Sequence, residues 1–248
     1  MRKNILITGA SAGLGEQMAR DFAARGRNLA LCARRLDRLE GLREELLAAH
    51  PGITVAVRQL DVTDHARVFE VFDAFHAELG GLDRIIVNAG GGKGRPVGTD
   101  GFAANLESAR TNFVAALTQC EAAVRIFRGQ RHGHLVVISS MSAMRGLPRS
   151  MTTYAATKAG VAALAEGIRA DLFGTGVKVT TVYPGYIVSE ANPVTRPKPM
   201  MVPTEQGVRA MVRAIERERP KAQVPAWPWV PVGFLMRHAP LRAVARLS

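Results

Sequence analysis

A short apolar run, a glycine-rich turn and an amphipathic helix follow one another at the start of the chain, and this order constrains the fold most. Residues 4–8 read Asn-Ile-Leu-Ile-Thr, the glycines are Gly9, Gly13 and Gly15, and helical spacing of apolar positions continues to residue 24. Strand, tight turn and helix in this order are typical of nucleotide-binding α/β domains. The glycines allow close approach to a pyrophosphate, whose charge the helix N-terminus meets. A tight turn without a ligand would show the same pattern.

Strand-like and helical segments alternate along the rest of the chain. Further strands are predicted at residues 28–33, 54–59, 84–88, 134–138, 178–183 and 222–224, and helices include residues 34–50, 105–128 and 204–217. This alternation predicts an α/β Rossmann fold with a single doubly wound parallel sheet of about seven strands flanked by helices. A chain of 248 residues suits one large domain. We expect residues 1–224 to form it and residues 225–248 to form an apolar, basic C-terminal tail.

Composition narrows the setting. Two cysteines and six scattered histidines indicate reduced thiols and no metal site, which favours a cytoplasmic location. No apolar run is long enough to span a bilayer, and no signal peptide is recognisable. Lys and Arg outnumber Asp and Glu by 33 to 21, which favours an anionic partner such as a phosphorylated cofactor, an acidic carrier or an anionic membrane. Specific nucleic-acid binding is not expected, because the basic residues are dispersed and no recognition motif accompanies them.

The end of the second strand bears on the choice of cofactor. Arg34 and Arg35 follow that strand about 20 residues after the glycines, where an acidic residue would hydrogen-bond a ribose 2′-hydroxyl. Arginine there accommodates a 2′-phosphate, and Ser11 can add a hydroxyl contact. The sequence therefore favours NADP(H) over NAD(H). After the third strand, Asp61 is a candidate partner for the adenine amino group, although its spacing suits a helix cap equally well.

Five polar residues are candidates for the reaction site. Tyr154 and Lys158 lie four residues apart on a predicted helix, so they share a face, and a nearby ammonium would lower the pKa of the phenol. Asn112 lies among apolar residues of a predicted helix and needs partners, either in a local backbone clamp or in a water relay. Ser139 and Ser140 follow the fifth strand, at the edge where open α/β sheets bind ligands.

In this order the motifs resemble those of the short-chain dehydrogenase/reductase family, over about residues 3–224. The carriers are Thr8-Gly9 with Gly13 and Gly15, then Asn88-Ala89-Gly90, then Tyr154 with Lys158, and then Pro184-Gly185 with Ser189. The sequence departs from the family's usual pattern at two points. Val87 stands where a second Asn is common, and the separation between Ser140 and Tyr154 is one residue longer than usual. The latter places one inserted residue within residues 145–153.

The resemblance implies roles for these residues. Tyr154 would be the general acid or base, Lys158 would lower its pKa and hold the nicotinamide ribose, and Asn112 would anchor a relay water. Ser140 would orient the substrate oxygen, with Ser139 and Ser142 as weaker candidates. The residues implied to bind NADP(H) are Gly9, Ser11, Gly13, Leu14, Gly15, Arg34, Arg35, Asp61, Val62, Asn88, Ala89, Gly90, Tyr154, Lys158, Pro184, Gly185, Ile187 and Ser189.

The expected function is hydride transfer between NADP(H) and a carbonyl or secondary alcohol. The alternative is a dinucleotide-binding sensor or scaffold without catalysis. Residues 91–97, 142–153 and 192–203 are expected to wall the substrate pocket. The resemblance further implies homodimers or homotetramers paired through the helices bearing Asn112 and Tyr154. The tail carries both tryptophans among apolar residues and arginines, which indicates packing on the same or a neighbouring subunit, or peripheral membrane contact and then a lipid-like substrate.

Overall fold

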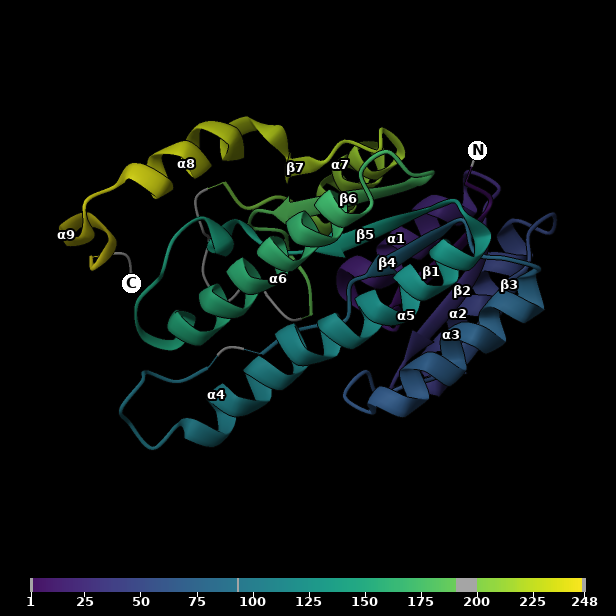
Figure 1. Cartoon of the computed structure of the whole chain (residues 1–248), viewed down its shortest axis with the longest axis horizontal. Coiled ribbons are helices and arrows are strands. Elements are labelled where there is room, and N and C mark those ends of the chain that lie inside the picture. The colour runs from purple at the N-terminus through teal and green to yellow at the C-terminus, as the bar shows by residue number, and fades with distance from the viewer. Residues whose placement is uncertain (1, 93, 191–199, 247–248) are drawn as a thin grey trace.

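The computed structural model describes residues 2–92, 94–190 and 200–246. Within them, seven parallel strands form one sheet in the order β3-β2-β1-β4-β5-β6-β7 (Figure 1). The strands are β1 (Asn4–Thr8), β2 (Asn28–Ala33), β3 (Val55–Gln59), β4 (Arg84–Val87), β5 (Gly133–Ile138), β6 (Val177–Pro184) and β7 (Lys221–Val224). The predicted doubly wound parallel sheet is confirmed.

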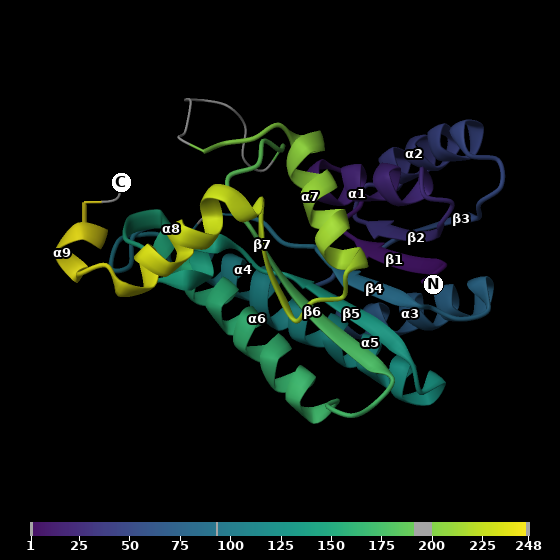
Figure 2. The same cartoon turned by 90° about the horizontal axis from the view of Figure 1, so that it is seen from above.

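Helices cover both faces of the sheet. The helices are α1 (Gly13–Ala23), α2 (Leu36–Ala49), α3 (His65–Leu79), α4 (Phe102–Ala109), α5 (Ala115–Gln130), α6 (Thr152–Asp171), α7 (Thr204–Glu216), α8 (Ala226–His238) and α9 (Leu241–Val244), with short turns η1 (Arg110–Val114), η2 (Met141–Met144) and η3 (Arg149–Met151). Figure 2 shows α1, α2 and α7 on one face and α3, α5 and α6 on the other.

The strand sequences explain why both faces are covered. In β1, Ile5 and Ile7 point into the core under α1, α2 and α7, whereas Leu6 points into the core under α3, α5 and α6. All three side chains are fully buried. A parallel strand buried on both sides reads as a continuous apolar run rather than an alternating one. Because the strands are parallel, their carboxyl ends meet at one edge, where the functional segments gather.

The predicted helix at residues 105–128 is interrupted. The structure has α4, then a π-helical stretch at η1, and then α5. A π-helical stretch inserts one residue into the hydrogen-bond ladder, which helical periodicity in a sequence does not reveal. It contains Asn112.

The tail forms two helices that the sequence analysis did not predict. Trp227 is non-helical, so Pro228 and Pro231 both lie near the start of the regular part of α8. There the missing N–H removes little hydrogen bonding. α8 packs on β7 and η2. None of the described helices, α8 included, is long and apolar enough to cross a membrane.

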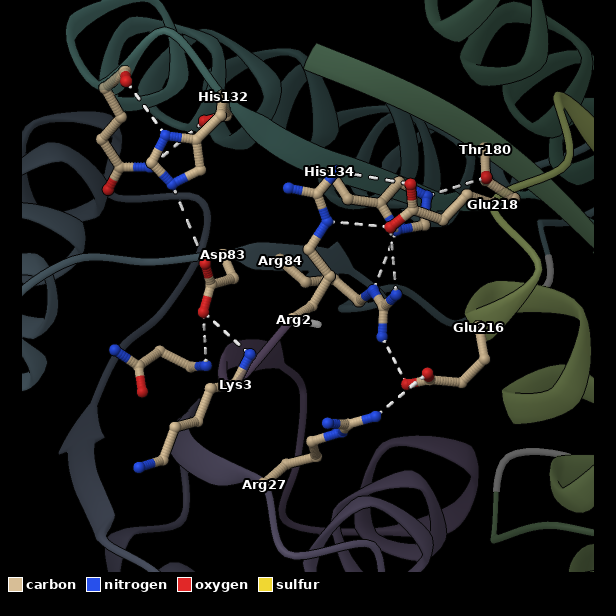
Figure 3. Close-up of polar contacts among 12 residues, drawn as sticks. Arg2, Lys3, Arg27, Asp83, Arg84, His132, His134, Thr180, Glu216 and Glu218 are labelled. Carbon is tan, nitrogen blue, oxygen red and sulfur yellow. Dashed lines mark hydrogen bonds and ion pairs between the residues drawn. The ribbon is translucent and has the colours of Figure 1, made fainter. Parts of the chain in front are cut away.

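A polar network surrounds buried Arg84 (Figure 3), near the amino-terminal ends of β4 and β5. Arg84, at the first residue of β4, donates from Nε to His134 Nδ1 over 2.8 Å and from a terminal nitrogen to Glu216 over 2.7 Å. Since a guanidinium only donates, Nδ1 of His134 accepts, and its Nε2 proton is donated to Thr180 Oγ1 over 2.8 Å. The neutral imidazole thus links β4, β5 and β6.

Candidate active site

The turn between β1 and α1 is tightly packed against the end of β4 and lines the cavity. Gly9 has a φ of 67°, and a Cβ built on it would lie 2.9 Å from Ala89 Cα. A Cβ on Gly15 would meet the carbonyl oxygen of Gly9. No side chain caps the N-terminus of α1, where Ala12 is the cap residue, so its first N–H groups are left for a ligand. This turn therefore fits a dinucleotide pyrophosphate.

Thr8 and Asn88 brace this turn from below. Thr8 Oγ1 accepts hydrogen bonds from the backbone N–H groups of Asn88 and Ala89, each over 3.0 Å. Asn88 Nδ2 donates to the Thr8 carbonyl over 2.9 Å. These bonds fix the ends of β1 and β4 against each other. Thr8 was absent from the predicted site residues; a small hydroxyl at the end of a buried apolar strand is the signal that could have pointed to it.

The end of β2 presents a cluster of cations beside the glycine turn. Arg35 donates from Nε to Ser11 Oγ over 3.3 Å and pairs with Glu190 at 2.9 Å. Arg38 reaches the same carboxylate at 3.2 Å. Arg34 borders the cavity beside them. The serine and arginines predicted to meet a 2′-phosphate are thus brought together.

Asp61 makes a turn after β3 rather than capping α3. Its Oδ1 accepts from the backbone N–H of Thr63 over 3.0 Å and from the Thr63 hydroxyl over 2.8 Å. The backbone hydrogen bond is the main reason why the pKa of Asp61 is lowered. Asp64 caps α3 by accepting from the backbone N–H of Arg67. Asp61 and Val62 both line the cavity, and an adenine contact for Asp61 stays a prediction.

Asn112 clamps the loop after β4 to the π-helical stretch. Its Oδ1 accepts from Gly91 N and its Nδ2 donates to Gly91 O, both over 2.9 Å. Nδ2 also donates to Ser108 Oγ over 3.2 Å. The side chain is buried. Of the two roles left open by the sequence, the structure contains the backbone clamp; the water relay stays a prediction.

Tyr154 and Lys158 lie one turn apart on α6 and both border the cavity. Nζ of Lys158 lies 6.0 Å from the centroid of the Tyr154 ring and donates to the Ile138 carbonyl over 3.0 Å. Burial lowers the pKa of Lys158 to about 8. The expected lowering of the Tyr154 pKa by Lys158 is not found. Burial raises the Tyr154 pKa, and a side-chain hydrogen bond with Ser140 opposes this shift.

The structure separates the three candidate serines. Ser139 is buried and donates its hydroxyl to the Lys158 carbonyl over 2.8 Å, so it fixes α6 to β5. Ser140 is hydrogen-bonded with Tyr154, and its Oγ accepts from Ser142 N over 3.1 Å. Ser140 and Tyr154 therefore form a hydroxyl pair at the cavity, which favours Ser140 over Ser139 for contact with a substrate oxygen.

The segment after β6 closes over the glycine turn. A Cβ built on Gly13 would lie 3.3 Å from the Ser189 Cβ. Ile187 is fixed by a bridge to Val202. Gly185 lies directly against the indole of Trp229, which leaves no room for a side chain there, and the ring of Tyr186 meets that indole edge-on at 5.2 Å.

One cavity of about 2270 Å³ joins these parts. Every residue predicted to bind the cofactor lines it, as does Ser140, whereas Asn112 lies behind its wall. A cavity of this size exceeds the usual range for a single small ligand. The space therefore suits a dinucleotide together with a substrate.

The substrate end of the cavity has an apolar wall that the sequence analysis missed in part. α8 contributes Trp229, Val232 and Met236, whereas residues 225–248 were expected to pack on the same or a neighbouring subunit or to contact a membrane, and not to line the cavity. Among residues 142–153, six line the cavity, as predicted: Ser142, Leu147, Pro148, Arg149, Ser150 and Met151. Of the described residues at 91–97, only Gly91 and Gly92 do so. The predicted wall at 192–203 lies largely outside the described residues, but Met200 borders the cavity.

Comparisons with known proteins agree with this geometry. Residues 3–199 match the family model described as short chain dehydrogenase. An uncharacterised oxidoreductase of Mycobacterium tuberculosis is 49% identical over 247 residues, covering 100% of this chain and 98% of the relative. An alcohol dehydrogenase from Thermococcus sibiricus, solved with 5-hydroxy-NADP, is 25% identical, with a TM-score of 0.78 over 89% of this chain and 94% of that one. A Burkholderia phymatum short-chain dehydrogenase/reductase solved with NAD shares the fold at 21% identity, with a TM-score of 0.83 over 94% of this chain and 92% of that one.

Proposed function

The chain belongs to the short-chain dehydrogenase family of oxidoreductases, and from this premise we propose that it transfers hydride between NADP(H) and a carbonyl or secondary alcohol on an apolar substrate. The observation that carries the proposal is the single cavity. It is lined by the glycine turn, by Arg34 and Arg35, and by the Ser140–Tyr154 pair with Lys158. Cofactor groups and proton-transfer groups thus open into one space.

The residues that would hold the dinucleotide follow from the fit of the glycine turn. Gly9, Gly13 and Gly15 line the cavity at the N-terminus of α1, where the pyrophosphate would lie. The segment from Pro184 to Ser189 would hold the nicotinamide end, which, when bound, supplies or accepts the hydride.

The preference for NADP(H) is supported by the end of β2. The strand closes with Ala33, so no carboxylate is available there for a ribose 2′-hydroxyl. Arg35 lies within hydrogen-bond reach of Ser11, and Arg34 borders the same part of the cavity. Two guanidinium groups and a hydroxyl are suited to a 2′-phosphate.

Tyr154 is proposed to move the proton. Because burial raises its pKa, the phenol stays protonated at neutral pH, which suits a general acid in carbonyl reduction. Ser140, hydrogen-bonded with Tyr154, would hold the substrate oxygen at the same place. The Lys158 ammonium would stabilise the phenolate that remains after proton donation. Asn112 acts indirectly, because it holds Gly91 beside the reacting groups.

The substrate class follows from the wall of the cavity. Trp229, Val232 and Met236 of α8 line the cavity together with Met141 and Leu147, and Tyr186 lies next to Trp229. Apolar and thioether side chains suit a lipophilic molecule and adapt to its shape. We therefore propose a lipophilic, lipid-like ketone or alcohol.

The test is NADPH oxidation with a panel of carbonyl compounds from short and polar to long and apolar. The wild type is compared with Tyr154→Phe and with Tyr183→Phe, a matched change on β6 outside the cavity lining. We expect turnover to rise with apolar chain length and to fall at least about a hundredfold in Tyr154→Phe alone. Nicotinamide fluorescence measures NADPH binding in all three proteins.

Two results would contradict the proposal. Equal rates in Tyr154→Phe and the wild type would show that another group donates the proton. Tight NADPH binding without turnover of any carbonyl or alcohol would instead support the non-catalytic sensor or scaffold.

A further inference from the structure

α8 has two apolar faces, and only one of them is covered. Trp229 and Gly233 are buried, and Val232 and Met236 turn toward the cavity. On the opposite side lie large side chains with exposed fractions between 51% and 79%. They are Trp227, Val230, Phe234 and Leu235 of α8 and Leu241 of α9. A helix that is apolar all round is normally buried on all sides.

These exposed residues gather on one projecting part of the molecule. Figures 1 and 2 both show α8 and α9 at the end of the molecule away from β2 and β3. The ring of Phe234 also contacts that of His238 at a tilt of 47°, with ring centroids 4.5 Å apart, so the exposed apolar residues adjoin the basic end of the helix. A contiguous exposed patch of this kind marks a contact surface, whereas scattered single apolar residues do not.

The charge of this segment selects the partner. After Glu218 the sequence contains no further Asp or Glu. Arg237, His238, Arg242 and Arg246 are all exposed among the apolar side chains. Trp, Phe and Leu interleaved with Arg on a short helix fit the headgroup region of an anionic bilayer.

A second copy of the chain suits this surface less well. A two-fold contact through α8 and α9 would bring the same patch of each copy together, and with it the same arginines. Like charges facing each other oppose association, and α8 and α9 carry no carboxylate side chain to offset them. An anionic lipid surface offers an apolar interior for the exposed apolar side chains and negatively charged headgroups for the arginines.

We propose that α8 and α9 dock on an anionic membrane surface, inserting Trp227, Val230, Phe234, Leu235 and Leu241. Because the inner face of α8 walls the cavity, docking holds the substrate end of the cavity at the lipid interface. Apolar molecules dissolved in the bilayer then reach the cavity along α8. The docking itself does not depend on the proposed hydride transfer, whereas the delivery of substrate does.

Tryptophan fluorescence measures this docking directly, because Trp227 and Trp229 are the two tryptophans of the chain. In Trp229→Phe, the emission comes from exposed Trp227 alone. The probe is a vesicle of phosphatidylcholine and phosphatidylglycerol in equal parts, compared with phosphatidylcholine alone. We expect a blue shift and co-sedimentation with the anionic vesicles, both weakened by salt.

Two pairs of variants locate the surface. Phe234→Ser combined with Leu235→Ser should weaken vesicle binding at least about tenfold, while Phe173→Ser, at an even more exposed apolar site after α6, should not. Arg237→Gln combined with Arg242→Gln should weaken it about tenfold or more. Arg128→Gln combined with Arg209→Gln changes the net charge equally on α5 and α7 and should have a smaller effect.

The outcomes separate the docking from the chemistry. Vesicle binding that is the same in the wild type and in the Phe234/Leu235 variant would overturn the inference. So would a blue shift that depends on protein concentration without lipid, together with a dimer in sedimentation velocity that this variant loses. Vesicle binding by a protein that turns over no carbonyl would leave the docking standing and reject the proposed function.

Discussion

Arg35 and Glu190 form an ion pair across the mouth of the cofactor end of the cavity, with two nitrogen–oxygen contacts of 2.9 and 3.3 Å. Arg38 contacts the same carboxylate, and Arg35 also reaches Ser11. Glu190 raises the pKa of Arg35, and Arg35 lowers that of Glu190. The carboxylate of Glu190 thus accepts hydrogen bonds from guanidinium groups that a bound 2′-phosphate would need as donors.

Replacing this carboxylate should therefore tighten NADPH binding. In Glu190→Gln, Arg35 and Arg38 are released, and we expect the NADPH dissociation constant to fall about threefold, while that of NADH stays unchanged. Nicotinamide fluorescence titrations measure both constants. Glu45→Gln, which breaks a similarly exposed pair with Arg20, is the control and should change neither. Weaker binding of both cofactors by Glu190→Gln would show that the pair clamps the dinucleotide instead.

Arg34 provides the complementary test of cofactor choice. Arg34→Asp should weaken NADPH binding by at least about tenfold and favour NADH, because a carboxylate repels a 2′-phosphate and accepts from a 2′-hydroxyl. Nicotinamide fluorescence titrations measure the dissociation constants of NADPH and NADH for this variant. Equal affinities for the two cofactors in the wild type, unaffected by this change, would exclude the NADP(H) preference.

The hydrogen bonds between Asn112 and Gly91 predict that alanine substitutions at two neighbouring glycines have different effects on stability. A Cβ on Gly90 would lie 2.8 Å from Asn112 Oδ1 and 3.4 Å from Lys158 Nζ, whereas a Cβ on Gly91 meets nothing within 4 Å. We expect Gly90→Ala to lower the free energy of unfolding by about 1–3 kcal/mol, because it displaces the buried amide from its partners. Gly91→Ala should change it by less than about 0.5 kcal/mol. Urea denaturation measures both, and equal losses would contradict the clamp.

Carbonyl reduction should decline as the pH rises through about 8. Lys158 is protonated below its pKa of about 8 and neutral above it, while the raised pKa of Tyr154 keeps the phenol protonated over the same range. Above pH 8 the phenolate left by proton transfer loses its cation. In Lys158→Arg the charge persists, so the decline should move to higher pH, whereas exposed Lys178→Arg should leave the profile unchanged. The measurement is kcat/KM against pH, and an unmoved profile in Lys158→Arg would assign the decline elsewhere.

The buried His134 should make stability depend on pH. Burial, followed by Arg84 and Arg2, holds its pKa well below 6.5, although Glu218 lies 3.7 Å from Nδ1. The unfolded chain therefore takes up the proton first, so the contribution of His134 is complete above about pH 6.5 and is lost as the pH falls below it. In His134→Gln, the Tm should fall less steeply below pH 6.5. His50→Gln, at a partly exposed site, should keep the wild-type slope.

The contact between Gly185 and Trp229 can be tested by its steric cost. Gly185→Ala places a methyl group inside the Trp229 ring, and we expect a loss of about 1–3 kcal/mol in unfolding free energy. A red shift of the tryptophan emission should accompany it as α8 moves outward. Gly167→Ala on α6, where nothing lies within 4 Å, should instead stabilise by about 0.5–1 kcal/mol. Equal changes in unfolding free energy for the two variants would contradict the packing of Trp229 of α8 against Gly185.

Local patterns predicted most of the fold. The apolar run before Gly9 is buried on both faces. Because a glycine-rich turn and a helix follow it directly, only a few fold topologies are compatible with this segment. Parallel strands bring their carboxyl ends to one edge, so Ser11 and Ser140 could be placed together from the sequence, whereas the place of Tyr154 beside them was implied by the family resemblance. The extra residue predicted within 145–153 stays a prediction; the chain makes the short turn η3 in that range.

Other features of the structure depend on tertiary contacts, which the periodicity of apolar residues in the sequence does not reveal. The π-helical stretch that aims Asn112 at Gly91 differs from a regular helix by a single residue. The role of α8 depends on Trp229 meeting a glycine 44 positions earlier in the chain. The direction of the Tyr154 pKa depends on burial, which four-residue spacing to a lysine does not reveal. Pairing of copies through the helices of Asn112 and Tyr154 stays a prediction, as does a cytoplasmic location.

The methionines of the cavity wall have a further consequence. Met141, Met151, Met200 and Met236, four of the nine in the chain, border the substrate end. Oxidation of a thioether to the sulfoxide turns a flexible apolar surface into a polar one and is reversed by dedicated reductases. Peroxide would therefore change the affinity for the proposed apolar substrates while sparing the cofactor end, where the described lining residues include no methionine. Substrate use by this protein would then vary with the oxidative state of the cell.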